Sequence, residues 1–150
     1  GPNHEELSCL IGVYEYFNNL FQHHFPGEDG SVREKIEKVN ELINKHEQEI
    51  ANPLLEYINS RDDIKLIGKG KIENKNRAPT IAFTINNKSS KDVSSELVSN
   101  GIATRNDNFY AWRCLKALGI DVDDGVVRTS MVHYNTHEDV NNLIEALKKI

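Results

Sequence analysis

Residues 125–140 read GVVRTSMVHYNTHEDV and combine a strand pattern with a helix start. The apolar and β-branched residues that dominate positions 126 to 132 predict a strand. Thr136 and Asp139 have the spacing of a capping box, in which a hydroxyl and a carboxylate satisfy backbone N–H groups at the first turn of a helix. A helix is therefore expected over residues 136–149, with four apolar side chains facing inward: Val140, Leu143, Ile144 and Leu147.

Short strands and helices alternate in the residues before this stretch. Apolar side chains at every second position predict a strand at 80–85. The remaining short elements are expected as strands at 64–67 and 102–104 and as helices at 90–99 and 108–118. Further upstream the helical spacing predicts two long helices, at 3–22 and 31–60, with Pro53 kinking or splitting the second near Asn52.

This order of elements predicts an α/β fold of the α+β type. We expect a two-layer small domain, in which a short mixed or antiparallel sheet is covered by helices and is preceded by the two long helices. Residues 1–60 would form a helical linker and interface, and residues 61–150 would form the small αβ domain. Together they are expected to make one compact domain overall.

The first predicted helix is apolar on two sides. One stripe is led by Leu7 and Tyr14, and a second stripe consists of Cys9, Val13, Tyr16 and Leu20. A helix of this kind needs partners on two sides, and a single small sheet covers only one. We therefore expect residues of the second stripe to be exposed or to contact another chain or domain.

Composition excludes several classes of function. The net charge of -5 repels a phosphate backbone, so a nucleic acid is not an expected partner. No apolar run reaches the ~20 residues that a membrane span needs. The two cysteines, Cys9 and Cys114, form no disulfide framework and suit a cytoplasmic protein. The pair His23-His24 lacks further ligands, so no metal site is expected.

Arg128 is the residue that departs from its surroundings, because it interrupts an apolar strand. It is either an edge arginine paired with an acid, or an arginine whose planar guanidinium, held on a rigid strand, binds a carboxylate through two hydrogen bonds. Arg105, Asn108 and Tyr110 form a polar and aromatic cluster at a strand-to-helix turn, where ligand-contacting side chains often gather. Taken alone, Asn108 is explained as the N-cap of the following helix.

Several segments together resemble class V aminotransferases, in the cysteine-desulfurase-like branch. They are the 125–140 stretch, RAPTIAFT at 77–84, NGIATR at 100–105 and PNHEEL at 2–7. The resemblance implies the C-terminal small domain of a homodimeric enzyme that depends on pyridoxal phosphate (PLP). In that family a large domain binds PLP, and the active site lies between the two domains.

The resemblance also implies roles for individual residues. Arg128 matches the arginine that binds the α-carboxylate of the amino-acid substrate, and Asn108 and Tyr110 fall in the loop that carries the desulfurases' sulfur-accepting cysteine. We expect the Arg128 guanidinium to lie near Arg105 and Asn108. Tyr110 occupies the place of the desulfurases' sulfur-accepting cysteine, and Cys114 lies one helical turn further on. Because a phenol cannot replace a thiolate in persulfide chemistry, an aminotransferase, epimerase or lyase reaction on an amino acid fits equally well.

The cofactor is expected to be held largely outside this chain. The family's threonine that donates to the PLP phosphate is missing from Gly1-Pro2-Asn3, which leaves Asn3 as the candidate cofactor-binding residue. None of the lysines matches the family's PLP-binding lysine, so we expect this chain to bind no PLP and to be inactive alone. Its partners would be the large PLP domain and a second subunit. The alternative is an independent αβ interaction or ligand-binding module without catalytic activity.

Overall fold

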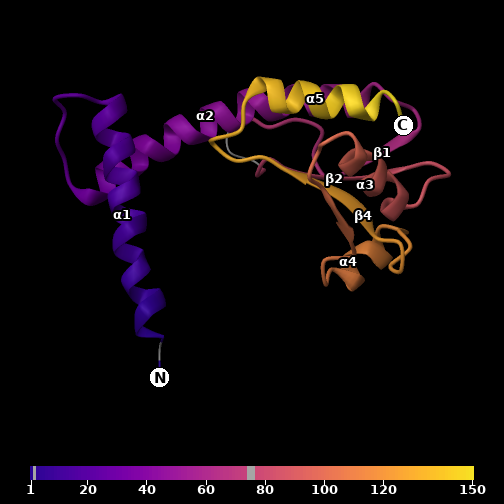
Figure 1. The fold of residues 1–150 in the computed structure, drawn as a ribbon, viewed down its shortest axis with the longest axis horizontal. Coiled ribbons are helices and arrows are strands. Elements are labelled where there is room, and N and C mark those ends of the chain that lie inside the picture. The colour runs from indigo at the N-terminus through magenta and orange to yellow at the C-terminus, as the bar shows by residue number, and fades with distance from the viewer. Residues whose placement is uncertain (2, 74–76) are drawn as a thin grey trace. The chain divides into compact units, whose positions relative to one another are not determined.

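The computed structural model describes residues 1, 3–73 and 77–150 and divides into two compact units, Gly1–Lys45 and His46–Ile150. The division between these units falls inside helix α2 (Val32–Asn59; Figure 1). The reason is that the C-terminal half of α2 belongs to the core of the second unit, where five of its side chains are fully buried: Ile50, Ala51, Leu54, Leu55 and Ile58.

The first unit contains helix α1 (His4–His24) and the start of α2. The Asn3 side chain caps α1 by accepting from the backbone N–H groups of Glu5 and Glu6, at 3.1 and 3.3 Å. Apolar side chains along α1 are 41–64% exposed, namely Leu7, Leu10, Ile11, Val13, Tyr14 and Tyr16. The expected exposure of the second stripe is therefore confirmed at Cys9, Val13 and Tyr16, while Leu20 is half-buried.

Helix α2 continues through Pro53, so of the kink or split expected near Asn52 the split does not occur. Proline removes one backbone hydrogen bond from a helix. Ile50 and Leu54, on either side of Pro53, are both fully buried against the sheet, and this packing stabilises the helix on both sides of the interruption.

Across the described residues, no helix is long and apolar enough to cross a membrane.

The sheet has four strands in the order β1-β2-β4-β3, and every neighbouring pair is antiparallel. The strands are β1 (Ile64–Ile67), β2 (Thr80–Ile85), β3 (Arg105–Asp107) and β4 (Val126–Ser130). The first two match the prediction. The expected strand at 102–104 is wrong, because the Ile102 N–H donates to the Leu97 carbonyl and so completes the end of the preceding helix. Strand β4 ends two residues early, because the Val132 N–H donates to the Asn135 side chain.

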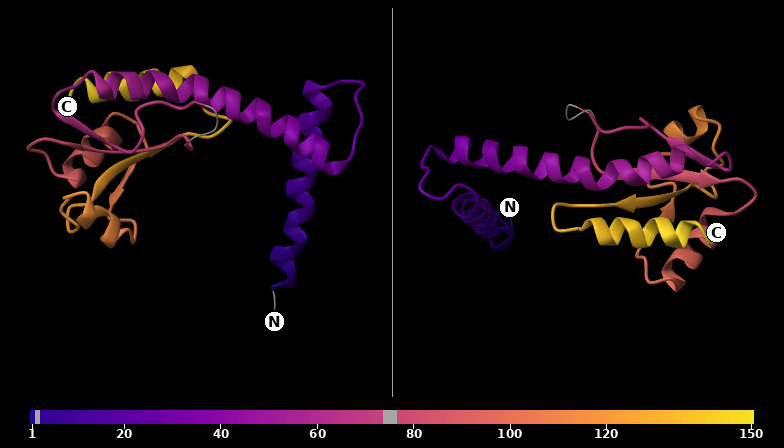
Figure 2. Two further views of the ribbon diagram at one scale, coloured as in Figure 1. Left: turned by 180° about the vertical axis from the view of Figure 1, so that it is seen from behind. Right: turned by 90° about the horizontal axis from the view of Figure 1, so that it is seen from above.

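One face of the sheet carries the core and packs against helices, and the opposite face is termed the open face. The C-terminal half of α2 and helix α5 (His137–Leu147) lie side by side over this face (Figure 2), and helix α3 (Ser90–Ser99) joins the same core through Val93 and Leu97. Ile81 and Phe83 of β2 face this core together with their register partners Thr129 and Val127 of β4. Because side chains alternate along a strand, residue 128 faces the opposite, open side.

Candidate functional site

Arg128 and Arg105 lie directly opposite each other on the open face of the sheet. They are register partners on β4 and β3, and side chains of such partners project from the same face. Like charges in this arrangement repel each other. In the described part of the chain, neither guanidinium forms an ion pair with an acid. The pair is therefore suited to an anion that comes from elsewhere.

The turn after β3 brings an aromatic ring over Arg128. The guanidinium carbon lies 3.9 Å from the centre of the Phe109 ring. Phe109 and Tyr110 have φ angles of 50° and 59°, in the left-handed region that bulky residues avoid. Each such residue costs on the order of 1–2 kcal/mol. The surrounding structure must therefore hold this turn in place.

Asn108 and Gly125 provide that support. The Asn108 Oδ1 accepts from the Tyr110 N–H at 3.0 Å, and its Nδ2 donates to the Val122 carbonyl at 3.2 Å. Gly125 has a φ of 74°, and a Cβ there would lie 2.3 Å from the carbonyl carbon of Asp107. The end of β3 and the start of β4 can approach this closely only at a glycine.

The expected helix at 108–118 is shorter in the structure, where α4 runs over Trp112–Ala117. Asn108 is not its N-cap, because Ala111 holds that position without a side-chain bond. The Asn108 carbonyl instead accepts from the Ala111 N–H at 2.8 Å, which closes the turn before the helix. The residue that looked like a cap is therefore an anchor of the Phe109–Tyr110 turn.

A cleft on the open face contains most of the predicted site residues. It is lined by Thr104, Arg105, Asn106, Asp107, Phe109, Tyr110 and Arg128. Arg105, Tyr110 and Arg128 are thus brought together, and Asn108 accepts a hydrogen bond from the Tyr110 N–H. Asn3 lies in the first unit, where its side chain caps α1. Sequence reasoning missed Phe109, because no residue pattern signals a left-handed phenylalanine.

The charges in the cleft favour a small anion. Two guanidiniums face one lining carboxylate, that of Asp107, which already accepts from the Asn108 N–H at 2.6 Å. A planar guanidinium matches a carboxylate with two parallel hydrogen bonds. Among the described residues no lysine lines the cleft, and no group of three His, Cys, Asp or Glu side chains could hold a metal ion.

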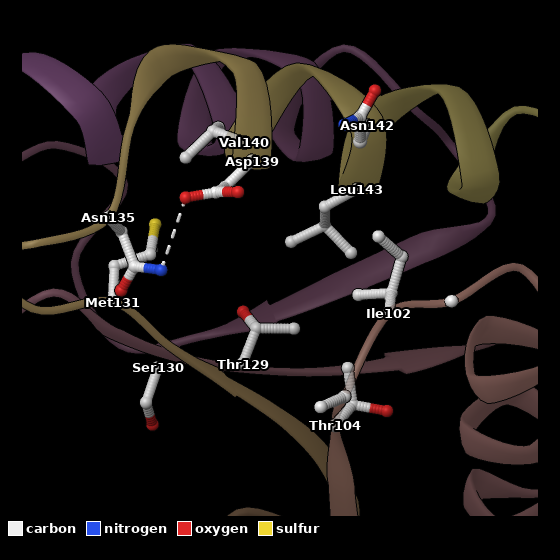
Figure 3. A pocket seen from close by; sticks show the side chains of 12 residues that line it. Ile102, Thr104, Thr129, Ser130, Met131, Asn135, Asp139, Val140, Asn142 and Leu143 are labelled. Atoms are coloured by element: carbon white, nitrogen blue, oxygen red, sulfur yellow. Dashed lines mark hydrogen bonds between the residues drawn. The ribbon is translucent and has the colours of Figure 1, made fainter.

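A second cavity, of about 260 Å³, lies between β4, α5 and residues 101–104 (Figure 3). Its one lining carboxylate, that of Asp139, accepts from the Thr136 N–H at 2.8 Å and from the Asn135 Nδ2 at 3.4 Å. These hydrogen bonds, first the one from the Thr136 backbone, hold the pKa of Asp139 below its ordinary value. They complete the predicted capping box of α5. The carboxylate of this cavity thus serves the fold, and the cleft at Arg128 is the better candidate site.

Comparison with known proteins assigns the chain to a family. The model of the aminotransferase class-V family matches residues 34–143, which include Arg105, Tyr110 and Arg128. The chain therefore belongs to the class V aminotransferase family. Curated relatives and solved structures that match the chain include cysteine desulfurases.

Two curated relatives illustrate the match. The chain is 38% identical over 113 residues to the aminotransferase-like protein FGM3 of Gibberella zeae, covering 73% of this chain and 28% of that protein. It is 31% identical over 107 residues to a probable cysteine desulfurase of Staphylococcus epidermidis, covering 71% of this chain and 24% of that protein. The chain thus spans about a quarter of the length of the curated relatives it matches.

Two solved structures share the fold. The cysteine desulfurase CsdA of Escherichia coli matches with a TM-score of 0.60 and 23% identity, over 71% of this chain and 24% of that chain. The apo cysteine desulfurase of Thermococcus onnurineus matches with a TM-score of 0.63 and 22% identity, over 79% of this chain and 29% of that chain. These likenesses confirm the predicted mixed α/β fold, with its short antiparallel sheet.

Proposed function

We propose that this chain is the C-terminal domain of a PLP-dependent enzyme that acts on an amino acid, and that Arg128 binds the carboxylate of that substrate. The observation that carries the proposal is the pair of guanidiniums, on facing strands of the open sheet face, that no acid of the described chain neutralises. An arginine fixed on a strand is pre-organised for bidentate carboxylate binding, which a flexible lysine is not.

The neighbouring residues have supporting roles in this proposal. Arg105, which is exposed, adds a second positive charge that attracts the carboxylate and keeps other cations away. Tyr110 is 97% exposed, so its phenol is free to hydrogen-bond to the rest of the substrate. Asn108 anchors the turn that carries Tyr110.

The cofactor is placed by other parts of the protein in this proposal. PLP supplies an electron sink, and the protein has to hold and orient it. The cleft offers guanidiniums but no lysine among its described lining residues, so it fits the substrate carboxylate and not the covalent attachment of the cofactor. Asn3 stays a candidate on the cofactor side: its Oδ1 is used by the cap of α1, so such a role would fall to its amide N–H groups.

Partners follow from the same proposal. The exposed apolar residues of α1 would contact the large PLP domain or a second subunit, because contiguous exposed apolar surface usually marks an interface. The two free cysteines suit a reducing cytoplasm.

Tyr110 limits the classes of reaction that the proposal includes. It stands where the family resemblance places the sulfur-accepting cysteine, and a phenol does not form a persulfide. The proposed chemistry is therefore an aminotransferase, epimerase or lyase reaction on an amino acid, and not desulfuration at position 110.

The test is a screen of the full-length protein that carries this chain, purified with PLP. Twenty amino acids and a matched set of amines that lack the carboxylate would be added while the cofactor absorbance is recorded. We expect at least one amino acid to change the absorbance at concentrations at which its amine counterpart does not. An equal response to amines and amino acids, or a protein that takes up no PLP, would overturn the proposal and favour an independent binding module.

A further inference from the structure

The Phe109 ring covers one face of the Arg128 guanidinium. With 3.9 Å between the ring centre and the guanidinium carbon, the contact is well inside the ~6 Å limit of a cation–π interaction. A guanidinium held by its face keeps its edge N–H groups free. Those edge groups are the ones that make paired hydrogen bonds to a carboxylate.

Without this ring, Arg128 would be poorly held. Arg105 lies directly opposite it, and the repulsion between two cations favours conformations in which the side chains separate. No acid in the described part of the chain forms an ion pair that would draw the Arg128 guanidinium back. The negative face of the Phe109 ring is the one attractive contact of this guanidinium that the described residues show.

Phe109 reaches this position only with an unfavourable backbone conformation. Its φ angle of 50° is unfavourable for an aromatic residue, and the next residue, Tyr110, shares the strain. The Asn108 side chain bonds on both sides of the turn, to the Tyr110 N–H and to the Val122 carbonyl, and so fixes it to the loop before β4. Strain held in this way beside a cleft is typical of functional sites.

We propose that Phe109 is a positioning residue, which fixes the plane of the Arg128 guanidinium so that its edge faces an incoming carboxylate. The inference rests on the proposed function, because that function gives Arg128 a carboxylate as its ligand. Phe109 acts through Arg128, and its aromatic face is the property that matters. A tyrosine at position 109 therefore preserves the role, and an aliphatic side chain of similar size does not.

The orientation is tested by NMR on this chain, labelled with ¹⁵N. The Nε–Hε resonance of Arg128 should carry a ring-current shift, because the guanidinium carbon bonded to Nε lies 3.9 Å from the centre of the ring. We expect Phe109→Leu and Phe109→Met to abolish the shift and Phe109→Tyr to retain it. Trp112→Leu, which removes an exposed aromatic side chain from the neighbouring α4, is the matched control and should leave the resonance in place.

Carboxylate binding is measured on the same samples by titration with sodium acetate at constant ionic strength. Phe109→Leu and Phe109→Met should bind acetate about fivefold more weakly, which is about 1 kcal/mol at 1.4 kcal/mol per tenfold. Phe109→Tyr should stay within about twofold of the unaltered chain, since it keeps the cation–π contact. Unchanged acetate affinity in both aliphatic variants would overturn the positioning role, even if the resonance moves.

A third variant separates this inference from the proposed function. If Arg128→Lys leaves acetate binding unchanged, the proposed function fails and the positioning role fails with it. If Arg128→Lys weakens acetate binding while the Phe109 variants do not, the carboxylate site stands and the positioning role alone is wrong.

Discussion

Gly125→Ala is expected to destabilise the chain strongly. The added Cβ would lie 2.3 and 2.4 Å from the carbonyl carbon and oxygen of Asp107 and 2.7 Å from the Asn108 nitrogen. All three are backbone atoms, so no side chain can rotate away. The φ of 74° adds the left-handed penalty of about 1–2 kcal/mol. Relief of the clash by backbone shifts costs about 1–3 kcal/mol more.

The sum, about 2–5 kcal/mol, is a large part of the 5–15 kcal/mol that typically stabilises a domain. The assay is urea unfolding followed by far-UV circular dichroism and by the fluorescence of Trp112. Gly119→Ala is the matched control, because Gly119 has a φ of 68° but nothing within 4 Å of its Cβ position. The control should lose only about 1–2 kcal/mol. If Gly125→Ala is no more destabilising than Gly119→Ala, the close approach of β3 and β4 at this glycine is wrong.

Three further predictions concern the cap of α5, the half-buried acid Glu47 and the cofactor. Thr136→Ala removes the hydroxyl that accepts from the Asp139 N–H and should cost about 1 kcal/mol in urea unfolding; no loss would show that the capping box does not stabilise the fold. Burial raises the pKa of the Glu47 carboxyl, so folding favours its protonated form. Above the pKa of about 4 that this carboxyl has in the unfolded chain, the charged form therefore lowers the stability of the fold. Glu47→Gln should therefore stabilise the chain at about pH 7 and lose this advantage below about pH 4, whereas an equal gain at both pH values would exclude titration of Glu47 as its cause. The chain alone should bind no PLP specifically, since no lysine lines the cleft in its described part; a stoichiometric, borohydride-trapped adduct on one defined lysine would contradict this.

The fold was predictable where side-chain pattern and local capping agree. Strand β2 shows apolar residues at alternate positions, and α5 starts at its capping box, so both were placed closely from sequence. Strand β3 was misplaced because its residues, Arg105–Asp107, are all polar and it pairs with β4 alone, at the edge of the sheet. Edge strands with an open face carry little hydrophobic signal.

The candidate site was only partly predictable. Arg128 could be found because a charged residue inside an apolar strand is unusual. The family resemblance then gave this residue a role, the binding of a substrate carboxylate. The pairing of Arg128 with Arg105 depends on the register of β3 and β4. This register could not be predicted, because β3 itself was expected at the wrong residues. Phe109 was missed for a different reason: its position depends on two left-handed residues, and the usual markers of that conformation are glycine and asparagine.

Kinetics of Arg128 variants in the full-length protein test the central claim most directly. With an amino-acid substrate, Arg128→Ala should raise KM by about tenfold to a hundredfold, the equivalent of about 1.5–3 kcal/mol for a lost charge-assisted contact. Arg128→Lys should recover only part of this, because an ammonium lacks the planar fork. Unaltered KM values in both variants, with the fold intact by circular dichroism, would contradict the assignment of Arg128 to the substrate carboxylate.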